Sequence, residues 1–530
     1  MHRPVTSTDW LARHARSQPH ALAVVDMGNG RRFTYAELDD RAERLAVALH
    51  EGHGLGPGDR VAIYSQNTTN VFEVQFACWK LGAAYVPLNW RLALPELEFI
   101  ARDCSPRILF HEGERADVAE RFAAATGIES RICWDGSAPG AADYEDLLAS
   151  ADAGASVVPR VRNTHDTLAC VMYTSGTTGH PKGALISHGA MVWNLLSATA
   201  PFGFRSGMVN LSVLPLFHIG GINAFANPAF HYGGTSYIMR AFDPGATLAA
   251  LGDPGIGITH FLAVPSNYLF MSQHPDFATA TFPTIVTAGI GGAPTPLPLL
   301  EAWAAKGVIL QQGYGMTESA ATISAQSKHD AVTKVGSIGT PLLHLEHRIV
   351  DEAGADVALG DVGELWVRGP NISAGYWNRP DANAQDWTDE WFHTGDAIRE
   401  DPDGALYILD RWKDMYISGG ENVYPAEVEN VIYQLAEVAE AAVIGVPHER
   451  WGEVGRAVVV LRANATLTPG EIVAHCSANL ARFKVPATVD LVDELPHNAT
   501  GKILKRELRA AVAPGRTGEP GVPRQPDDPG

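Results

Sequence analysis

One stretch decides the fold: Tyr173-Thr174-Ser175-Gly176-Thr177-Thr178-Gly179-His180-Pro181-Lys182-Gly183, which follows the apolar run at 168–172. Its three glycines let backbone N–H groups turn toward an anion, and its hydroxyls and lysine add further donors. A polyphosphate needs such a set of donors. Apolar residues resume at 184–186, so we expect a loop that joins two strands. The spacing is not that of P-loop NTPases, and a flexible surface loop is the alternative interpretation.

The chain around this stretch alternates between helix and strand patterns. Thr34 and Glu37 form a capping box before apolar residues at helical spacing over 38–49. A strand at 61–64, a helix through 72–79 and a strand at 84–86 follow. This alternation indicates an α/β architecture with mostly buried sheets.

The pattern changes near residue 396 to short β units. Asp403-Gly404 marks a hairpin turn. After about residue 412 we expect a compact α+β module, with Pro425 opening a helix, Thr468 capping another, and strands at 441–446, 457–461 and 488–492. The tail from 513 to 530 is rich in Pro and Gly, and we expect it to be disordered.

Composition narrows the class of protein. With 530 residues, two or more domains are expected, and no apolar run reaches the length of about 18 residues that a membrane span needs. The first residues lack the apolar segment of a secretory signal. The five cysteines are scattered, which fits a reducing cytoplasm and not a disulfide framework. The net charge of −20 argues against broad nucleic-acid binding.

Further motifs follow in order, and together with the first stretch they resemble the adenylate-forming superfamily, in its branch of acyl-CoA synthetases. Both fatty-acid–CoA ligases and aryl-CoA ligases are similar. The resemblance spans roughly residues 30–510, and its further motifs lie at 214–218, 291–294, 312–318, 392–396, 410–425 and 496–503.

This resemblance implies a specific fold and division of the chain. A large N-terminal α/β domain at 1–411 would contain mixed sheets with helices and a small β-barrel-like subdomain. A small, mobile α+β domain would follow at 412–510, pivoting on the hinge residue Lys413, and a disordered tail would occupy 511–530.

The implied reaction is ATP-dependent ligation of a carboxylic acid to CoA, through an acyl-adenylate, with Mg²⁺ as cofactor. Glu318 would hold the metal, since such magnesium sites typically use one carboxylate, and Thr317 would donate to the α-phosphate. Tyr314 would stack on adenine, Asp396 would bind the two ribose hydroxyls, and Arg411 would add a guanidinium contact to the same nucleotide. The implied nucleotide contacts are Thr174, Ser175, Gly176, Thr177, Thr178, Lys182, Gly292, Ala293, Pro294, Tyr314, Asp396 and Arg411.

Lys502 is the predicted adenylation catalyst. Attack of a carboxylate on the α-phosphate brings two anions together, and an ammonium between them stabilises the transition state. For the thiol step, Trp451 and Phe483 are candidate CoA contacts, although either could be domain core, and His218 is a candidate gate of the pantetheine tunnel.

The resemblance also predicts which residues line the acid pocket, from the positions that line it in the family. The pocket comprises His218, Gly220, Gly221, Asn223, Ala288, Gly289 and Gly315. The two glycines at 220 and 221 suggest volume for a large or cyclic acid. The absence of an acidic residue over 214–223 disfavours an amino acid, so a fatty, alicyclic or aryl acid is expected.

Two alternatives stay open. The enzyme could load a carrier-protein thiol instead of CoA, or the chain could be a non-catalytic nucleotide sensor on the same fold. A homodimer is also left open by the sequence.

Overall fold

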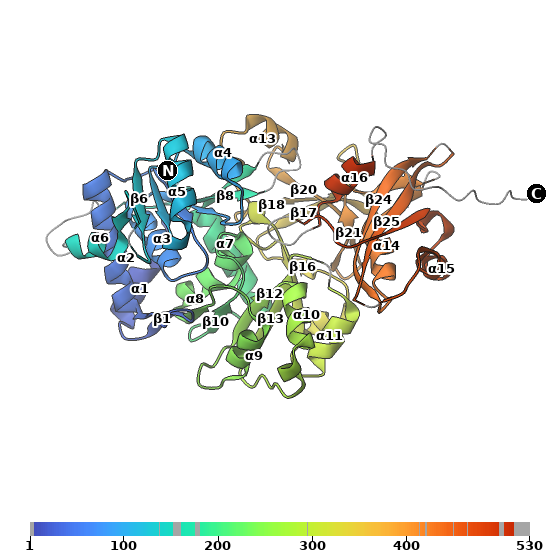
Figure 1. Cartoon of the computed structure of the whole chain (residues 1–530), viewed down its shortest axis with the longest axis horizontal. Coiled ribbons are helices and arrows are strands. Elements are labelled where there is room, and N and C mark those ends of the chain that lie inside the picture. Colours follow the sequence, from blue (N-terminus) through green and yellow to red (C-terminus); the bar gives the residue numbers. More distant parts are fainter. Residues whose placement is uncertain are drawn as a thin grey trace, which may run out of the picture. The chain divides into compact units, whose positions relative to one another are not determined.

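The structure is a computed structural model that describes residues 5–136, 138–151, 161–174, 181–293, 295–412, 414–418, 421–448, 450–463, 465–497 and 503–512. The chain divides into two compact units (Figure 1). The first comprises Met1–Thr394 with Ile398–Ile408, and the second comprises Gly395–Ala397 with Leu409–Gly530. Of the predicted disordered tail, residues 513–530 lie outside the described residues, whereas 511 and 512, which the division at 510 had assigned to the tail, are the last residues of a helix. The predicted domain boundary at 411 stays a prediction.

A seven-stranded sheet forms the N-terminal part of the first unit, in the order β7-β6-β5-β3-β4-β8-β9. All its described pairings are parallel except that of β8 with β9. The strands are β3 (Arg60–Tyr64), β4 (Ala84–Leu88), β5 (Ile108–His111), β6 (Ser130–Cys133), β7 (Ala142–Asp143), β8 (Leu168–Thr174) and β9 (Lys182–Ser187). The helices of this region, labelled in Figure 1, are α2 (Tyr35–His53), α3 (Asn70–Leu81), α4 (Leu94–Cys104), α5 (Ala116–Thr126) and α6 (Tyr144–Ser150).

Helix α2 shows why the local prediction succeeds. The backbone N–H of Thr34 donates to the Glu37 carboxylate at 2.8 Å, and the N–H of Glu37 donates to the Thr34 hydroxyl at 3.3 Å. These reciprocal bonds fix the first turn, as the capping box predicted. The apolar side chains at helical spacing, Leu38, Ala42, Leu45 and Leu49, are fully buried. The helix therefore packs on its predicted face.

A nine-stranded sheet forms the second part of the same unit, in the order β16-β15-β14-β13-β12-β10-β11-β1-β2. Its strands are β1 (Leu22–Asp26), β2 (Arg32–Thr34), β10 (Val209–Ser212), β11 (Thr235–Ile238), β12 (His260–Ala263), β13 (Thr287–Gly291), β14 (Leu310–Tyr314), β15 (Ser324–Ala325) and β16 (Thr340–Pro341). The helices of this region are α1 (Trp10–Ser17), α7 (His188–Phe202), α8 (Asn227–Tyr232), α9 (Pro244–Gly252), α10 (Pro265–Gln273), α11 (Leu297–Ala304) and α12 (Lys328–Thr333).

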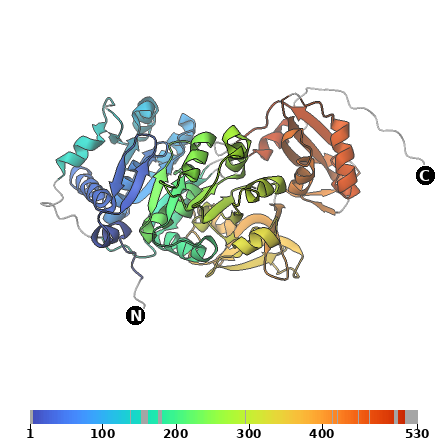
Figure 2. The ribbon, with the colours of Figure 1, turned by 90° about the horizontal axis from the view of Figure 1, so that it is seen from below.

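A smaller antiparallel sheet follows, in the order β17-β18-β20-β19, with β21 paired to β20. Its elements are β17 (Glu346–Val350), β18 (Val362–Arg368), α13 (Pro380–Asp386), β19 (Trp387–Thr388), β20 (Trp391–Glu400) and β21 (Leu406–Arg411). The predicted turn at Asp403-Gly404 is present, with the Gly404 N–H donating to the Asp401 carbonyl at 2.9 Å. In Figure 2 the yellow and gold strands form a layer of their own.

The described part of the C-terminal unit forms a sheet in the order β23-β22-β25-β24, with β26 paired to β25. Its elements are β22 (Tyr416–Ser418), β23 (Glu421–Val423), α14 (Pro425–Ile432), β24 (Val438–His448), β25 (Gly452–Leu461), α15 (Pro469–Asn479), β26 (Thr488–Val492) and α16 (Lys505–Val512). Pro425 begins α14, and Thr468 caps α15, as predicted. The predicted fold class, a large α/β part with mixed sheets followed by a small α+β part, is confirmed.

Candidate active site

The predicted phosphate loop connects the two antiparallel strands β8 and β9. Thr174 pairs with Lys182 and Tyr173 with Gly183 across this hairpin, so the stem brings the threonine and the lysine opposite each other. The prediction of a strand–loop–strand arrangement is therefore confirmed. Four predicted contacts at the tip, Ser175, Gly176, Thr177 and Thr178, lie outside the described residues.

Several motif residues meet at one edge of the nine-stranded sheet. Strands β13 and β14 are parallel neighbours that end at Gly291 and Tyr314, so Gly292, Ala293 and the turn at 315–319 all follow carboxyl ends. Strand β10 lies between β11 and β12, so the strands that follow it in sequence lie on opposite sides of it. Its carboxyl end is therefore a topological switch point of the sheet. Open α/β sheets bind ligands at such points. The motif at 214–218 begins there. Pro294 lies outside the described residues.

Glu318, the predicted metal ligand, is held by a residue that the sequence analysis missed. The Tyr376 hydroxyl donates to Glu318 Oε1 at 2.8 Å, and both side chains are buried. Burial, followed by the neighbouring Glu318 carboxylate, raises the pKa of Tyr376, so its hydroxyl keeps its proton and can act as the donor. Thr317, beside Glu318, is buried in the same short turn.

Lys182 lies against the same tyrosine. Its ammonium is 4.8 Å from the centroid of the Tyr376 ring and 2.8 Å from Asp386 Oδ2. The side chain of Lys182 is only 10% exposed, so the ion pair is more shielded from water than a typical surface pair. Asp386, which ends α13, is the second residue here that the sequence analysis missed.

Magnesium fits this site through a single carboxylate. Within the described residues there is no group of three or more His, Cys, Asp and Glu side chains that could hold a metal. A magnesium ion bound with nucleotide phosphates commonly takes only one or two protein carboxylates and keeps waters. Glu318, fixed by Tyr376, suits that mode of binding.

The glycines of the predicted acid pocket serve two different purposes. No atom lies within 4 Å of a Cβ added at Gly220, in agreement with the predicted free volume. A Cβ at Gly221 would instead collide with the carbonyl oxygen of Pro215, and one at Gly315 with that of Ala321. The interpretation of Gly221 as free volume is therefore wrong, because close backbone approach requires glycine there.

Apolar side chains line the region of Ala288 and Gly289. A Cβ added at Gly289 would lie 2.9 Å from Leu262 Cδ1 and 3.0 Å from Phe225 Cζ. Larger residues at 289 would displace these neighbours. The wall at this position is therefore aromatic and aliphatic.

Asn223 lies in a π-helix at Gly220–Ala226, a form often found at functional sites. Its side-chain amide donates to the Ala320 carbonyl at 2.6 Å and its oxygen accepts from Asn227 at 3.1 Å. These bonds engage both ends of the amide and connect the π-helix to the turn after Glu318. Asn223 thus shapes the region, and its contact with an acid stays a prediction.

His218 precedes this π-helix. Its side chain is exposed to solvent, yet desolvation by the surrounding protein lowers its pKa below the ordinary value. The imidazole is consequently neutral at pH 7.

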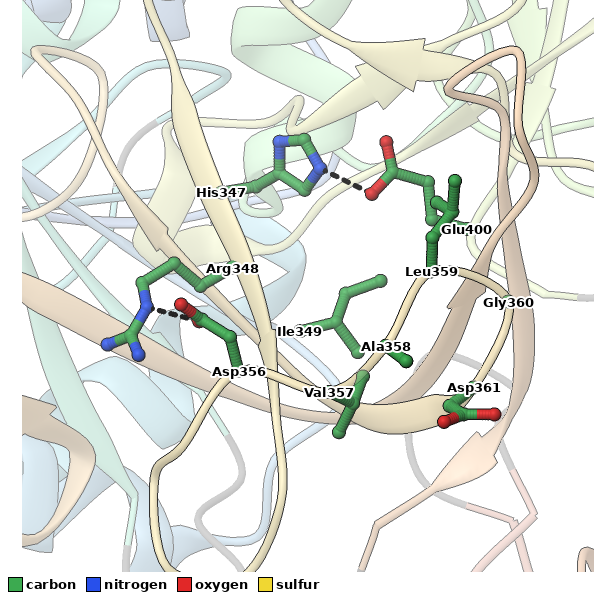
Figure 3. A pocket seen from close by; sticks show the side chains of 10 residues that line it. All are labelled: His347, Arg348, Ile349, Asp356, Val357, Ala358, Leu359, Gly360, Asp361 and Glu400. Carbon is green, nitrogen blue, oxygen red and sulfur yellow. Dashed lines mark hydrogen bonds and ion pairs between the residues drawn. The ribbon is translucent and has the colours of Figure 1, made fainter.

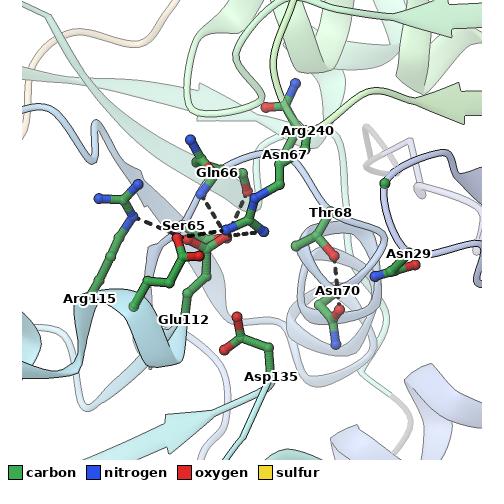
Figure 4. Close-up of polar contacts among 12 residues, drawn as sticks. Asn29, Ser65, Gln66, Asn67, Thr68, Asn70, Glu112, Arg115, Asp135 and Arg240 are labelled. Carbon is green, nitrogen blue, oxygen red and sulfur yellow. Dashed lines mark hydrogen bonds and ion pairs between the residues drawn. The ribbon is translucent and has the colours of Figure 1, made fainter.

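Asn67, another residue that sequence reasoning missed, holds the segment before His218. Its amide donates to the carbonyls of Leu214 and Met239 at 2.9 and 3.1 Å, and its oxygen accepts from the N–H of Leu216 at 2.8 Å. It follows β3, beside a polar network in which the buried Glu112 carboxylate accepts from Ser65 and pairs with Arg115 and Arg240 (Figure 4). These contacts join the two large sheets.

The remaining nucleotide candidates are placed as follows. Tyr314 is 9% exposed and belongs to the apolar cluster that includes Ile323 and Ile338. Asp396 is buried in β20, and Arg411 ends β21. The predicted catalyst Lys502 and the hinge residue Lys413 lie outside the described residues. Their roles stay predictions.

Trp451 and Phe483, the candidate CoA contacts, are both exposed, at 46% and 37%. Arg450 lies over the Trp451 ring at 4.7 Å, and Lys484 lies over the Phe483 ring at 5.6 Å. The alternative interpretation of these rings as core of the small domain is thus wrong. Each ring lies beside a cation. An aromatic ring can stack on a nucleotide base and a cation can pair with phosphates, so the two together suit a nucleotide ligand.

A cavity of about 240 Å³ lies in the antiparallel sheet (Figure 3). Its polar side chains pair with one another, His347 with Glu400 at 3.1 Å and Arg348 with Asp356 at 2.6 Å. It contains none of the motif residues. This cavity is therefore not the predicted site.

Known proteins share this arrangement over nearly the whole chain. Residues 11–377 match the family described as AMP-binding enzyme, and residues 427–502 match the AMP-binding enzyme C-terminal domain. A feruloyl-CoA synthase from Amycolatopsis sp is 39% identical over 500 residues, covering 94% of this chain and 98% of that protein. An indoleacetate–CoA ligase from Aromatoleum aromaticum is 38% identical over 506 residues, covering 96% and 98%. The structure of ATP-bound MatB from Rhodopseudomonas palustris superposes with a TM-score of 0.86 at 32% identity, covering 96% of this chain and 99% of that one.

Proposed function

This chain belongs to the family of AMP-binding enzymes and is an AMP-forming acid–CoA ligase, and from that premise we propose that its substrate is an aryl-substituted carboxylic acid. The observation that carries the proposal is the near-complete coverage by two relatives, named for feruloyl and indoleacetate groups, both of which are aromatic. The apolar wall formed by Phe225 and Leu262 at Gly289, and the open space at Gly220, support it.

An amino acid does not suit this pocket. Residues 214–223 contain no acidic side chain to hold a substrate ammonium. Both ends of the one amide in that segment, Asn223, are already hydrogen-bonded to protein. An uncharged ring system makes no such demand on the pocket, so an aryl acid avoids leaving a buried charge unpaired.

The first half-reaction joins the acid to AMP. Thr174, Lys182 and the loop between them would bind the phosphates, and Thr317 would donate to the α-phosphate. Glu318 would hold Mg²⁺, which offsets phosphate charge when bound. Tyr314, Asp396 and Arg411 would bind the nucleoside. Lys502, carried by a mobile C-terminal domain that pivots at Lys413, would stabilise the charge that develops as the carboxylate attacks.

The second half-reaction transfers the acyl group to the CoA thiol, with release of AMP. Trp451 and Phe483, both exposed beside a cation, would contact the CoA nucleotide. His218, neutral at pH 7, would line the path of the pantetheine arm without adding a buried charge.

We place the reaction in the cytoplasm. The cysteines of the described residues are all free and buried, namely Cys78, Cys104, Cys133, Cys170 and Cys476. Free thiols persist in a reducing compartment. No helix within the described ranges is long and apolar enough to cross a bilayer. Whether two copies associate would be measured by light scattering of the purified enzyme.

The experiment is a substrate panel with ATP, Mg²⁺ and CoA, scored for AMP and for CoA thioester. The panel contains hydroxycinnamic acids, arylacetic acids, alicyclic acids, straight-chain fatty acids and amino acids. We expect kcat/KM to be highest for an aryl acid. Higher kcat/KM for a fatty acid would contradict the substrate class while leaving the ligase activity intact.

The same panel separates the alternatives. A carrier-protein loader would form acyl-adenylate but leave CoA unacylated, and would acylate a phosphopantetheinylated carrier protein. A non-catalytic sensor would show no acid-dependent exchange of pyrophosphate into ATP.

A further inference from the structure

We propose that Tyr376 is a positioning residue that aligns the metal carboxylate of Glu318 with the phosphate-loop cation of Lys182, an inference that rests on the proposed function. Three observations carry it: the hydroxyl of Tyr376, its ring, and the backbone on either side of it each contact a different part of the site.

The hydroxyl fixes the carboxylate. It donates to Glu318 Oε1 at 2.8 Å, and Tyr376 is 5% exposed. A protonated phenol at this place holds the plane of the carboxylate without carrying charge of its own. Carboxylates that bind metals depend on such outer partners for their orientation.

The ring supports the cation. The Lys182 ammonium lies 4.8 Å from the ring centroid and is paired with Asp386 at 2.8 Å. An aromatic face attracts a cation, and a rigid ring restricts where the flexible lysine stem can go. One side chain therefore touches both the predicted metal ligand and the predicted phosphate ligand.

The backbone around Tyr376 ties the same two motifs together. The N–H of Ser373 donates to the Glu318 carbonyl at 2.6 Å, and the N–H of Trp377 donates to the Gly183 carbonyl at 2.7 Å. Asn383 Oδ1 accepts from the Tyr376 N–H at 2.7 Å, which holds the residue itself. The segment at 373–377 is thus fastened to the turn containing Glu318 at one end and to β9 at the other.

This arrangement explains how two motifs that are far apart in sequence acquire a common geometry. A nucleotide's phosphates with their magnesium ion need a cation on one side and a carboxylate on the other, at a fixed separation. Tyr376 sets that separation because it contacts both. It makes no predicted contact with ATP, the acid or CoA, so we call it a positioning residue.

The test is calorimetric titration of the full-length enzyme with ATP, without acid or CoA, once in Mg²⁺ and once in EDTA. Tyr376→Phe keeps the ring and removes the hydroxyl. The matched control is Tyr144→Phe, because the Tyr144 hydroxyl also donates at 2.8 Å to a buried glutamate, Glu73, away from the site.

For Tyr376→Phe we expect the affinity for ATP in Mg²⁺ to fall about 10-fold, the lower end for loss of a metal ligand's outer partner. Its affinity in EDTA should equal that of the parent. Tyr144→Phe should match the parent in both buffers. Equal affinities of Tyr376→Phe and parent in Mg²⁺ would overturn the inference, and so would an equal loss in both buffers, which indicates a purely structural role.

Two further measurements keep the inference testable. If Tyr376→Phe fails to fold by circular dichroism, Asn383→Ala tests the same positioning without altering the metal ligand, since it removes the side-chain oxygen that accepts from the Tyr376 N–H. It should lose affinity in Mg²⁺ and not in EDTA, and equal losses would overturn the inference. Thioester formation by the parent tests the proposed function separately, so failure of either idea is distinguishable from failure of the other.

Discussion

The side-chain oxygen of Asn67 accepts a hydrogen bond from the backbone N–H of Leu216 at 2.8 Å, joining the end of β3 to the segment that leads to His218. Two further bonds run from the Asn67 amide to the carbonyls of Leu214 and Met239. One buried amide thereby connects the two large sheets where the acid pocket begins.

Asn67→Ala should therefore lower the free energy of unfolding and raise the KM for the acid. Three hydrogen bonds of about 1 kcal/mol each predict a loss of about 3 kcal/mol. The KM for ATP should change less, because Asn67 does not contact the phosphate hairpin. Urea unfolding and initial rates at varied acid concentration measure the two effects.

Asn163→Ala is the matched control, since the Asn163 amide donates a single bond, to the Trp79 carbonyl at 2.6 Å. It should cost about 1 kcal/mol and leave the KM for the acid unchanged. A similar KM in both variants would show that Asn67 does not position the pocket.

Gly220 and Gly221 should respond differently to the same added methyl group. Gly220→Ala has open space and should keep or slightly raise the melting temperature, while discriminating against the bulkiest acids. Gly221→Ala forces a Cβ against the Pro215 carbonyl and should cost about 1–3 kcal/mol. Thermal unfolding and the acid panel measure both. Equal melting temperatures of the two variants would contradict the assignment of space at 220 and close approach at 221.

Acid should destabilise the protein through buried histidines. Burial lowers the pKa of His188 and of His260 to about 4. The unfolded value is about 6.5, so the unfolded state takes up protons first, and stability is complete above pH 6.5 and is lost as the pH falls toward 4. At pH 5 each histidine should therefore lower the free energy of unfolding by about 2 kcal/mol.

Urea unfolding at pH 7.5 and pH 5.0 measures this loss. His260→Asn should reduce the difference between the two pH values by about 2 kcal/mol, whatever it costs at pH 7.5. An unchanged difference would mean that His260 does not titrate in the unfolding equilibrium.

Local signals made much of the fold predictable. Thr34 and Glu37 are three residues apart and cap α2 by themselves, and the backbone hydrogen bond that closes the turn at Asp403-Gly404 joins near neighbours in the chain. The strand–loop–strand arrangement at the phosphate loop followed from apolar runs on both sides. Each of these predictions needed only neighbouring residues, because the interactions that decide them are local.

The residues that sequence reasoning missed act over long separations. Tyr376 bonds to Glu318, 58 positions away, and Asn67 bonds to Leu214, 147 positions away. Neither position differs locally from an ordinary core tyrosine or turn asparagine. The error at Gly221 has a different cause, because the carbonyl oxygen of Pro215 that excludes a side chain there is close in sequence but belongs to an irregular turn that periodicity cannot show.

We propose above all that an ammonium at Lys502 enables acyl-adenylate formation. The most direct measurement compares acid-dependent pyrophosphate exchange into ATP for Lys502→Ala and parent, alongside thioester formation from a synthetic acyl-adenylate and CoA. We predict that exchange falls about 10²–10³-fold, the effect of losing one transition-state donor, while thioester formation from the synthetic adenylate persists. Exchange at the parental rate in Lys502→Ala would contradict the account.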